Sequence, residues 1–426
     1  MTIAPVLFAM VSAQTASLKL PLPTPRQVEW HDMELTSFVH FAPNTWQDKE
    51  YDDLSLSPSQ LNPTLLNTDQ WAKTVKEGGS KMLIFVAKHV GGFCWWQTKT
   101  TEYSVKNSPW RAGKGDVMAD LQKSCKKYGL KLGVYLSPAD SKHGIEVGGR
   151  AKDPAQQEAY TKIFREQLTE LLSKYGEIYE VWFDGSLIFD VSDILAKYAP
   201  NAIVFQGPQA NIRWVGNEEG FVPYPGWNGA KYDPKTWGTL TSADGDPNGD
   251  RWLPNEVDCR IRDTWFWNTK NAPALKSVDT LMRMYERSVG HGGVMLLNQT
   301  PDPTGLIPAT DVKRVKEFAQ EIERRYGAPI VTSQGKGKVV IAQPSSPMVV
   351  DAVSIMEDIH FGERVRKYIV EGMVDGTWEM LAEGTAIGHK KIDKFDPVRV
   401  ASVRLTITEA AGEPIIRQLA VFRTQH

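Results

Sequence analysis

The sequence predicts an α/β fold in which a (β/α)8-like TIM barrel is followed by a C-terminal β-sandwich domain. Apolar strand-like segments alternate with amphipathic helical segments between residues 35 and 325, which is typical of a parallel sheet. The pattern changes after residues 327–329, where short strands and turns replace the helices. The chain of 426 residues has room for one barrel of about 250 residues and one smaller domain.

The predicted barrel strands are near-continuous apolar runs, as expected for parallel strands buried on both faces. A closed barrel is favoured over an open doubly wound sheet, because no glycine-rich phosphate loop follows any strand. Seven strands are clear and an eighth is poorly marked. The seven cover residues 35–41, 82–89, 131–137, 178–184, 202–206, 256–261 and 294–298.

The helices between these strands carry start and stop signals. The segment 154–175 opens on Asp153-Pro154, a capping residue followed by proline at the first helical position, and it stops at Gly176. The segment 116–128 ends before Gly129. Further helices are expected over residues 277–289 and 309–326.

The C-terminal region reads as an all-β domain. We expect the catalytic barrel to occupy residues 21–330, a Gly/Ser/Lys linker to occupy 333–338, and the sandwich to extend over 335–426. With Trp378 as its one clear aromatic side chain, the sandwich is expected to brace the barrel rather than bind sugar. Its predicted strands are residues 349–356, 365–370, 398–407 and 415–422.

Composition excludes several classes of protein. The 49 basic and 51 acidic residues nearly balance, so no partner nucleic acid or anionic membrane surface is expected. The 3 cysteines are too few for a disulfide framework or a zinc site, and we expect no metal and no cofactor. Residues 1–20 form a possible leader, since an apolar run over 4–11 precedes Ala13 and Ala16, although no positive residue precedes it. This favours a periplasmic or secreted protein over a cytoplasmic one. No other apolar stretch approaches the ~20 residues of a membrane span.

Asp184 is the sharpest candidate for chemistry. It follows the strand at 178–183 and precedes Gly185, and functional side chains of parallel barrels lie at the carboxyl ends of strands. Tryptophans gather near the strand ends, and sugars stack on such rings. Hydrolysis of a glycoside needs two carboxyl groups. The candidates for the second are Glu218, Glu219 and Glu256.

Several sequence blocks resemble the α-L-fucosidases, glycoside hydrolase family 29. They match in order, and the resemblance covers the barrel and, more loosely, the C-terminal domain. The blocks are Phe38-Val39-His40-Phe41, Asn44-Thr45-Trp46, Ala87-Lys88-His89, Gly133-Val134-Tyr135, Trp182-Phe183-Asp184-Gly185, Ile212-Arg213-Trp214-Val215-Gly216-Asn217-Glu218 and the discoidin-like start Ile355-Met356-Glu357.

The resemblance implies a retaining exo-α-L-fucosidase whose substrate is a fucosylated oligosaccharide or glycan. Asp184 would be the nucleophile and Glu218 the general acid/base, preferred over Glu219, with Glu256 as the alternative. The block around Glu218 is similar to the branch that favours 1,3- and 1,4-linked fucose. Arg213 and the two histidines are expected to favour charge on Asp184. The residues expected to hold the sugar are His40, Trp46, Glu50, His89, Tyr135, Trp182 and Arg213.

The sequence departs from the family pattern at two adjacent positions. Val90 stands where the family has a second histidine, and Gly91 where it has an aspartate. Valine offers only an apolar surface, so the sugar can differ from plain fucose. Two other functions therefore stay open, an exo-glycosidase acting on a galactose-type sugar and a non-catalytic carbohydrate-binding barrel.

Overall fold

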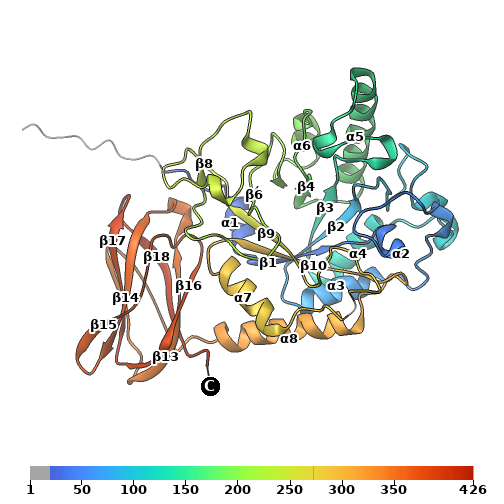
Figure 1. The fold of residues 1–426 in the computed structure, drawn as a ribbon. Helices are drawn as coiled ribbons and strands as arrows, with labels where there is room; N and C mark the ends of the chain where they lie inside the picture. The colour runs from blue at the N-terminus through green and yellow to red at the C-terminus, as the bar shows by residue number, and fades with distance from the viewer. Residues whose placement is uncertain (1–19, 272, 426) are drawn as a thin grey trace, which may run out of the picture.

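The computed structural model describes residues 20–271 and 273–425, so the possible leader lies largely outside the described residues. A parallel eight-stranded sheet with the order β5-β4-β3-β2-β1-β10-β9-β6 forms the first part of the molecule (Figure 1). A parallel bridge between Phe205 and Ile212 joins β5 to the residue before β6 and closes the sheet into a barrel. The predicted barrel is therefore confirmed.

The barrel strands are β1 (Leu35–Val39), β2 (Met82–Lys88), β3 (Lys131–Leu136), β4 (Glu180–Trp182), β5 (Ile203–Phe205), β6 (Arg213–Trp214), β9 (Asn255–Arg260) and β10 (Val294–Gln299). The helices are α1 (Pro25–His31), α2 (Asn44–Gln47), α3 (Thr68–Glu77), α4 (Val117–Tyr128), α5 (Pro154–Lys174), α6 (Ser192–Tyr198), α7 (Val278–Ser288) and α8 (Ala309–Tyr326). The short strands β7 (Gly229–Ala230) and β8 (Arg251–Trp252) pair outside the barrel.

The long helices begin and end where their signals lie. Asp153 caps α5 by accepting a hydrogen bond from the backbone N–H of Gln156, and Asp116 caps α4 in the same way. Gly129 ends α4 in the left-handed conformation that glycine adopts without strain. None of the helices in the described part of the chain combines the length and apolarity needed to cross a bilayer.

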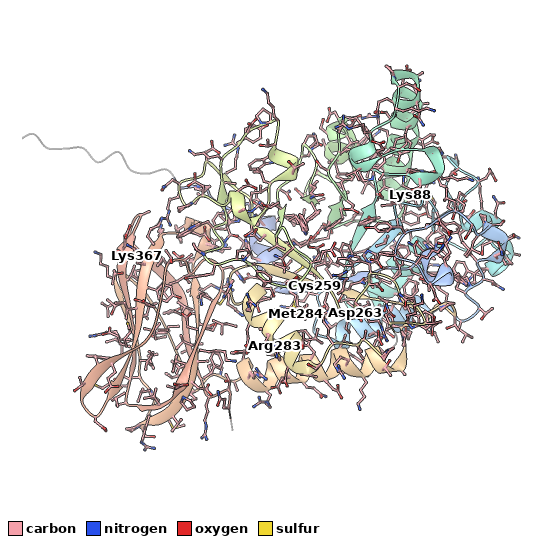
Figure 2. The ribbon with its side chains drawn as sticks, in the orientation of Figure 1. Lys88, Cys259, Asp263, Arg283, Met284 and Lys367 are labelled. Carbon is pink, nitrogen blue, oxygen red and sulfur yellow. The ribbon has the colours of Figure 1, made fainter. Side chains whose placement is uncertain are left out.

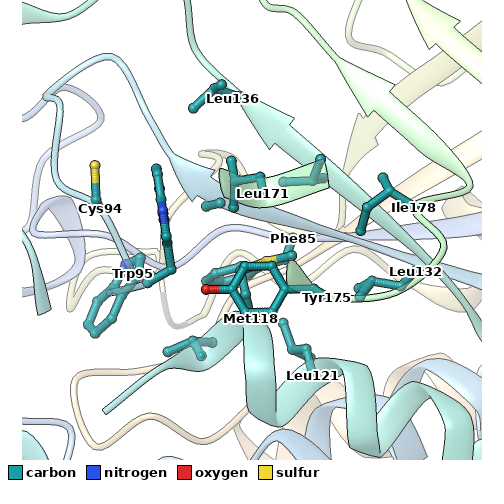
Figure 3. Close-up of a cluster of buried hydrophobic side chains, with 14 of the residues drawn as sticks. Phe85, Cys94, Trp95, Met118, Leu121, Leu132, Leu136, Leu171, Tyr175 and Ile178 are labelled. Atoms are coloured by element: carbon teal, nitrogen blue, oxygen red, sulfur yellow. The ribbon is translucent and has the colours of Figure 1, made fainter. Parts of the chain in front are cut away.

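The helices pack their apolar faces onto the outside of the barrel. Figure 3 shows part of this core, where Met118 and Leu121 of α4 meet Phe85 of β2 and Leu132 of β3. The core fixes the strands, and the strands in turn fix the side chains at their carboxyl ends.

The C-terminal domain is a sandwich of two antiparallel four-stranded sheets with the orders β11-β18-β13-β16 and β12-β17-β14-β15. The predicted linker at 333–338 is wrong, because β11 pairs with β18 across it. Its alternating burial and edge position hid it from the sequence pattern. The strands are β11 (Val331–Lys336), β12 (Val339–Ala342), β13 (Met348–Glu357), β14 (Val365–Val374), β15 (Thr377–Gly384), β16 (Lys391–Val400), β17 (Val403–Ala410) and β18 (Ile415–Phe422).

The sandwich lies against the barrel on the side of α1 and α7 (Figure 1). Asp32, which follows α1, accepts from Arg417 of β18 at 2.8 Å. Glu286 of α7 pairs with Lys394 of β16 at 3.1 Å. Figure 2 shows that Lys88 belongs to the barrel, whereas Lys367 lies on the sandwich.

Candidate active site

A pocket of about 500 Å³ opens at the carboxyl ends of the barrel strands. Its wall combines aromatic rings, imidazoles and carboxyl groups, which is the mixture that a sugar with apolar C–H faces and polar hydroxyls requires. Strand ends on opposite sides of the barrel contribute to it. The lining residues are Phe38, His40, Glu50, Tyr51, His89, Val90, Tyr135, Trp182, Asp184, Glu218, Asp258 and Trp265.

Asp184 enters the pocket just beyond β4. Its carboxylate Oδ2 accepts a hydrogen bond from the Tyr135 hydroxyl at 2.8 Å. Burial raises the pKa of Asp184, the Tyr135 hydrogen bond acts against this rise, and the nearby Glu218 adds to it. Asp184 is thus a partly desolvated carboxylate oriented by one donor, which is a suitable state for a nucleophile.

His40 and His89 face the same cavity from β1 and β2. The His40 Nδ1 lies 2.7 Å from Asn298 Oδ1, and the Asn298 amide donates to the Trp265 carbonyl, so Nδ1 carries the proton and Nε2 is the acceptor. Burial lowers the pKa of His40 well below its usual value and lowers the pKa of His89 to about 4. Both imidazoles are therefore neutral at pH 7. Neither imidazole therefore brings a positive charge to the pocket, and the expectation that the two histidines favour charge on Asp184 is corrected.

Glu218 lies in the loop after β6, at the more open side of the pocket. Its side chain is 40% exposed, and its Oε2 lies 3.4 Å from Nη1 of Arg260. Glu50 reaches the same side from the loop after α2, where its carboxylate accepts from the Trp265 backbone N–H at 3.0 Å. Burial raises the pKa of Glu50, and Arg260 opposes the rise. Glu218 thus has both the solvent access and the proximity to Asp184 that a proton donor needs.

Arg213 does not line the pocket, and its predicted role in holding sugar is corrected. It is buried in β6 and donates to Asn255 Oδ1 at 3.1 Å and to the carbonyls of Leu253 and Trp227. Burial lowers its pKa to about 10. These bonds tie β6 to the chain before β9 and to the end of the loop that carries Glu218, so Arg213 supports this loop from behind.

Two more predicted residues lie outside the pocket wall. Trp46 packs against Phe41 and Trp95 in the core beside α2, rather than facing the cavity. Glu256 is buried inside the barrel, where its Oε2 accepts from Trp182 Nε1 at 2.7 Å. Burial and the neighbouring Glu180 raise the pKa of Glu256 well above its usual value. Glu256 therefore orients Trp182 and is poorly placed to reach a glycosidic oxygen.

Four lining residues were not among the predicted site residues, namely Phe38, Tyr51, Asp258 and Trp265. Asp258 follows Glu256 by two positions, so the alternation of the strand puts both side chains on the inner face of the barrel. That alternation was a usable signal. Tyr51 and Trp265 belong to loops, and only the folded chain brings them to the pocket.

The two atypical positions on the β2 loop have different consequences. Val90 faces the pocket and gives its wall an apolar patch. Gly91 faces away from it, and a Cβ atom there would collide with the Asp52 carboxylate. Asp52 is buried and accepts from the Tyr103 hydroxyl at 2.7 Å and from Gln47 Nε2 at 2.8 Å. The absence of a side chain at 91 therefore makes room for a carboxylate that fixes the loop carrying Glu50.

Comparison with known proteins agrees with this geometry. A family model described as Alpha-L-fucosidase matches residues 21–325. Alpha-L-fucosidase 1 of Arabidopsis thaliana is 32% identical over 95% of this chain and 88% of its own length. The chain therefore belongs to the α-L-fucosidase family, glycoside hydrolase family 29.

Solved structures of family members share the whole architecture of this glycoside hydrolase. A putative α-L-fucosidase from Bacteroides thetaiotaomicron has a TM-score of 0.88 at 34% identity and covers 96% of this chain and 100% of its own. A family 29 fucosidase from Ruminococcus gnavus, solved as a mutant in complex with fucose, has a TM-score of 0.87 at 27% identity and covers 95% of each chain. The fucosidase described here thus shares both of its domains with these relatives.

Proposed function

We propose that the protein is a retaining exo-α-L-fucosidase that releases terminal fucose by double displacement. The observation that carries this proposal is the convergence of Asp184 and Glu218 in one pocket, whose lining residues Phe38, Tyr135 and Trp182 belong to the buried cluster of the barrel interior. A pocket that ends at a filled barrel interior favours the end of a sugar chain over its middle. Fucose bound by the Ruminococcus gnavus relative supports fucose as the glycone.

In the first step, the Asp184 carboxylate attacks the anomeric carbon while Glu218 gives a proton to the departing oxygen. The covalent glycosyl–Asp184 ester then reacts with water, from which Glu218 removes a proton, and the sugar leaves with retained configuration. The Nε2 atom of the neutral His40 ring can accept a hydrogen bond from a hydroxyl group of the sugar. The exposed position of Glu218 leaves room for the aglycone beyond the pocket mouth.

The apolar patch of Val90 supports fucose over the galactose-type alternative. Fucose carries a methyl group where galactose carries a hydroxymethyl group, and an apolar wall leaves that extra hydroxyl unpaired. Because apolar pockets discriminate weakly against an added hydroxyl, we expect kcat/KM for an aryl α-L-fucoside to exceed that for the α-L-galactoside by about 10–100-fold. The resemblance around Glu218 favours 1,3- and 1,4-linked substrates, which a panel of fucosylated oligosaccharides tests.

The decisive experiment is hydrolysis of an aryl α-L-fucoside followed by NMR of the first-formed anomer. We expect the α anomer from the wild type, no turnover from Asp184→Asn, and a loss of about 10²–10⁴-fold from Glu218→Ala on a substrate with a poor leaving group. On an activated aryl fucoside, whose leaving group departs without a proton, azide should restore turnover of Glu218→Ala by attacking the glycosyl–Asp184 ester, whereas Glu219→Ala should behave like the wild type.

Three results would contradict the proposal. They are formation of the β anomer, an active Asp184→Asn variant, and a wild type that binds fucose without hydrolysing any fucoside. The last would support the non-catalytic alternative.

We also infer export of the protein, because residues 4–16 combine an apolar run with small residues. Cell fractionation with sequencing of the mature N-terminus tests this. An intact Met1 in the cytoplasmic fraction would contradict it.

A further inference from the structure

Asp258 is a carboxyl group of the pocket that has no function in the double displacement. It lies on β9 and is 4% exposed, and this small exposure faces the cavity that Asp184 and Glu218 share. Trp214 Nε1 donates to its Oδ1 at 2.7 Å. Among the described residues, no donor bonds its Oδ2. One oxygen is thus fixed as an acceptor, and the other is free for a ligand.

The surroundings of Asp258 differ from those of the other three carboxyl groups in the pocket. Asp184 has the Tyr135 hydroxyl, Glu218 has Arg260, and Glu50 has the Trp265 backbone N–H and lies near Arg260. Burial and the neighbouring Glu218, Glu256 and Asp184 raise the pKa of Asp258 well above its usual value. Because Oδ1 accepts from Trp214, Oδ2 is the oxygen left to hydrogen-bond a ligand in the pocket.

We propose that Asp258 is a specificity-determining residue whose free Oδ2 forms a hydrogen bond with one ring hydroxyl of the bound sugar. This inference rests on the proposed function. The contact makes the site depend on one hydroxyl, since a sugar without that hydroxyl leaves a buried polar atom unpaired.

The test is a set of aryl α-L-fucosides, each lacking one ring hydroxyl, assayed with the wild type, Asp258→Leu and Asp258→Asn. For the wild type, removing the hydroxyl that Asp258 contacts should lower kcat/KM by about 10–100-fold. In Asp258→Leu, removal of this hydroxyl should leave kcat/KM about unchanged, whereas removal of each other hydroxyl should lower kcat/KM as much as it does in the wild type. Asp258→Asn keeps a hydrogen-bonding group of the same size at the same place, so it should retain the full pattern.

The design separates the inference from the proposed function. A wild type that hydrolyses no fucoside overturns the proposed function. A wild type that is active, with every deoxy penalty unchanged in Asp258→Leu, overturns the inference alone. A general distortion of the pocket would lower kcat/KM for all substrates by the same factor, which also counts against a specific contact. If Asp258→Leu does not fold, Asp258→Ala replaces it, and loss of the pattern in a folded Asp258→Asn overturns the inference as well.

Discussion

The hydrogen bond from Tyr135 to Asp184 shows how single residues set the chemistry of the pocket. Tyr135 lies on β3, next to β4, so the two strands bring its hydroxyl close to the Asp184 carboxylate, which follows β4 by two residues. Its ring stacks on Trp182 with ring centroids 5.3 Å apart, and Trp182 is held in turn by Glu256. The position of the donor is thus fixed by a chain of buried contacts inside the barrel.

Removing this donor should change the pH dependence of catalysis. In Tyr135→Phe the carboxylate loses the bond that opposes the effect of burial, so the pKa of Asp184 should rise further, by about one unit for a charge-assisted hydrogen bond. Since Asp184 must be ionised to attack, the acidic limb of the kcat/KM profile should move to higher pH. A profile measured from pH 3 to pH 8 checks this.

The matched control is Tyr175→Phe. It removes a similar bond to the carboxylate of Asp116, outside the pocket, at 2.8 Å. Its acidic limb should stay at the wild-type position. An unchanged limb in Tyr135→Phe, or an equal shift in both variants, would mean that Tyr135 does not set the charge of Asp184.

At the scale of elements, the loop between α2 and residue 54 matters most, since it brings Glu50 and Tyr51 to the pocket. Asp52 anchors this loop to Tyr103 and Gln47 and also accepts from the Leu54 backbone N–H at 2.8 Å. The anchor lies against Gly91, which follows β2. A glycine on one loop therefore determines the position of sugar-facing residues on another.

The variant Gly91→Ala tests this dependence. Its new methyl group would displace the Asp52 carboxylate, so Glu50 and Tyr51 should shift and KM for an aryl fucoside should rise by roughly 10-fold, with a smaller effect on kcat. Asp52→Ala should have a similar effect because it removes the anchor itself. Gly335→Ala on β11, where the added carbon approaches Val340 of the sandwich, should leave KM unchanged. Wild-type kinetics in Gly91→Ala would refute the dependence.

How far the sequence predicts the elements depends on their length. The strand at 82–88 is apolar in all but its last residue, and its position is clear from this continuous run. The eighth strand, Arg213–Trp214, has only 2 residues, and no pattern can form over that length. In the sandwich, the predicted strand at 398–407 includes parts of two strands, because the chain passes at residues 401–402 from β16 in one sheet to β17 in the other, without a glycine or proline there.

Site residues at the ends of strands could be predicted from the sequence. Those whose side-chain direction depends on tertiary contacts could not. Asp184, His40 and Tyr135 follow from the rule that barrel chemistry lies at the carboxyl ends of strands. Arg213 also lies on a strand, but its side chain turns to backbone carbonyls behind the pocket. The direction of the Arg213 side chain depends on the carbonyls of Leu253 and Trp227, which are not its neighbours in sequence, so no local sequence pattern predicts it.

At the scale of the whole molecule, the sandwich helps to hold the loop that carries Glu218. Tyr224 lies in the same loop, and its hydroxyl donates to the Ala386 carbonyl of the sandwich at 2.8 Å. At the end of the loop, the backbone N–H and side-chain amide of Asn228 donate to the buried Glu363 carboxylate of the sandwich at 2.9 Å and 2.7 Å. The loop that carries the proposed acid/base thus has one end on the barrel and the other on the second domain.

Breaking the contact between Asn228 and Glu363 should lower kcat, although both residues lie outside the pocket wall. In Glu363→Ala the two Asn228 donors lose their buried partner, so the free energy of unfolding should fall by about 1–3 kcal/mol. As the Glu218 loop loosens, kcat should fall by roughly 10-fold. Thermal unfolding and steady-state kinetics measure the two effects.

Glu371→Ala is the matched control. Its carboxylate belongs to the same domain but pairs with Arg404 within the sandwich, so kcat should stay at the wild-type value. A Glu363→Ala variant that loses stability while keeping full kcat would show that the sandwich stabilises the fold without positioning the loop.

The contact between Asn228 and Glu363 restricts how this enzyme can be recombined with its relatives. A donor segment that replaces residues 215–228 to change the aglycone preference arrives without the matching surface at residues 363–389. Such a chimera would have both reactive carboxyl groups, but the one at position 218 would be displaced because its loop would lack the contact with the sandwich. The unit that can be exchanged between family members is therefore the loop together with its half of the sandwich, although the two are separated by more than a hundred residues of chain.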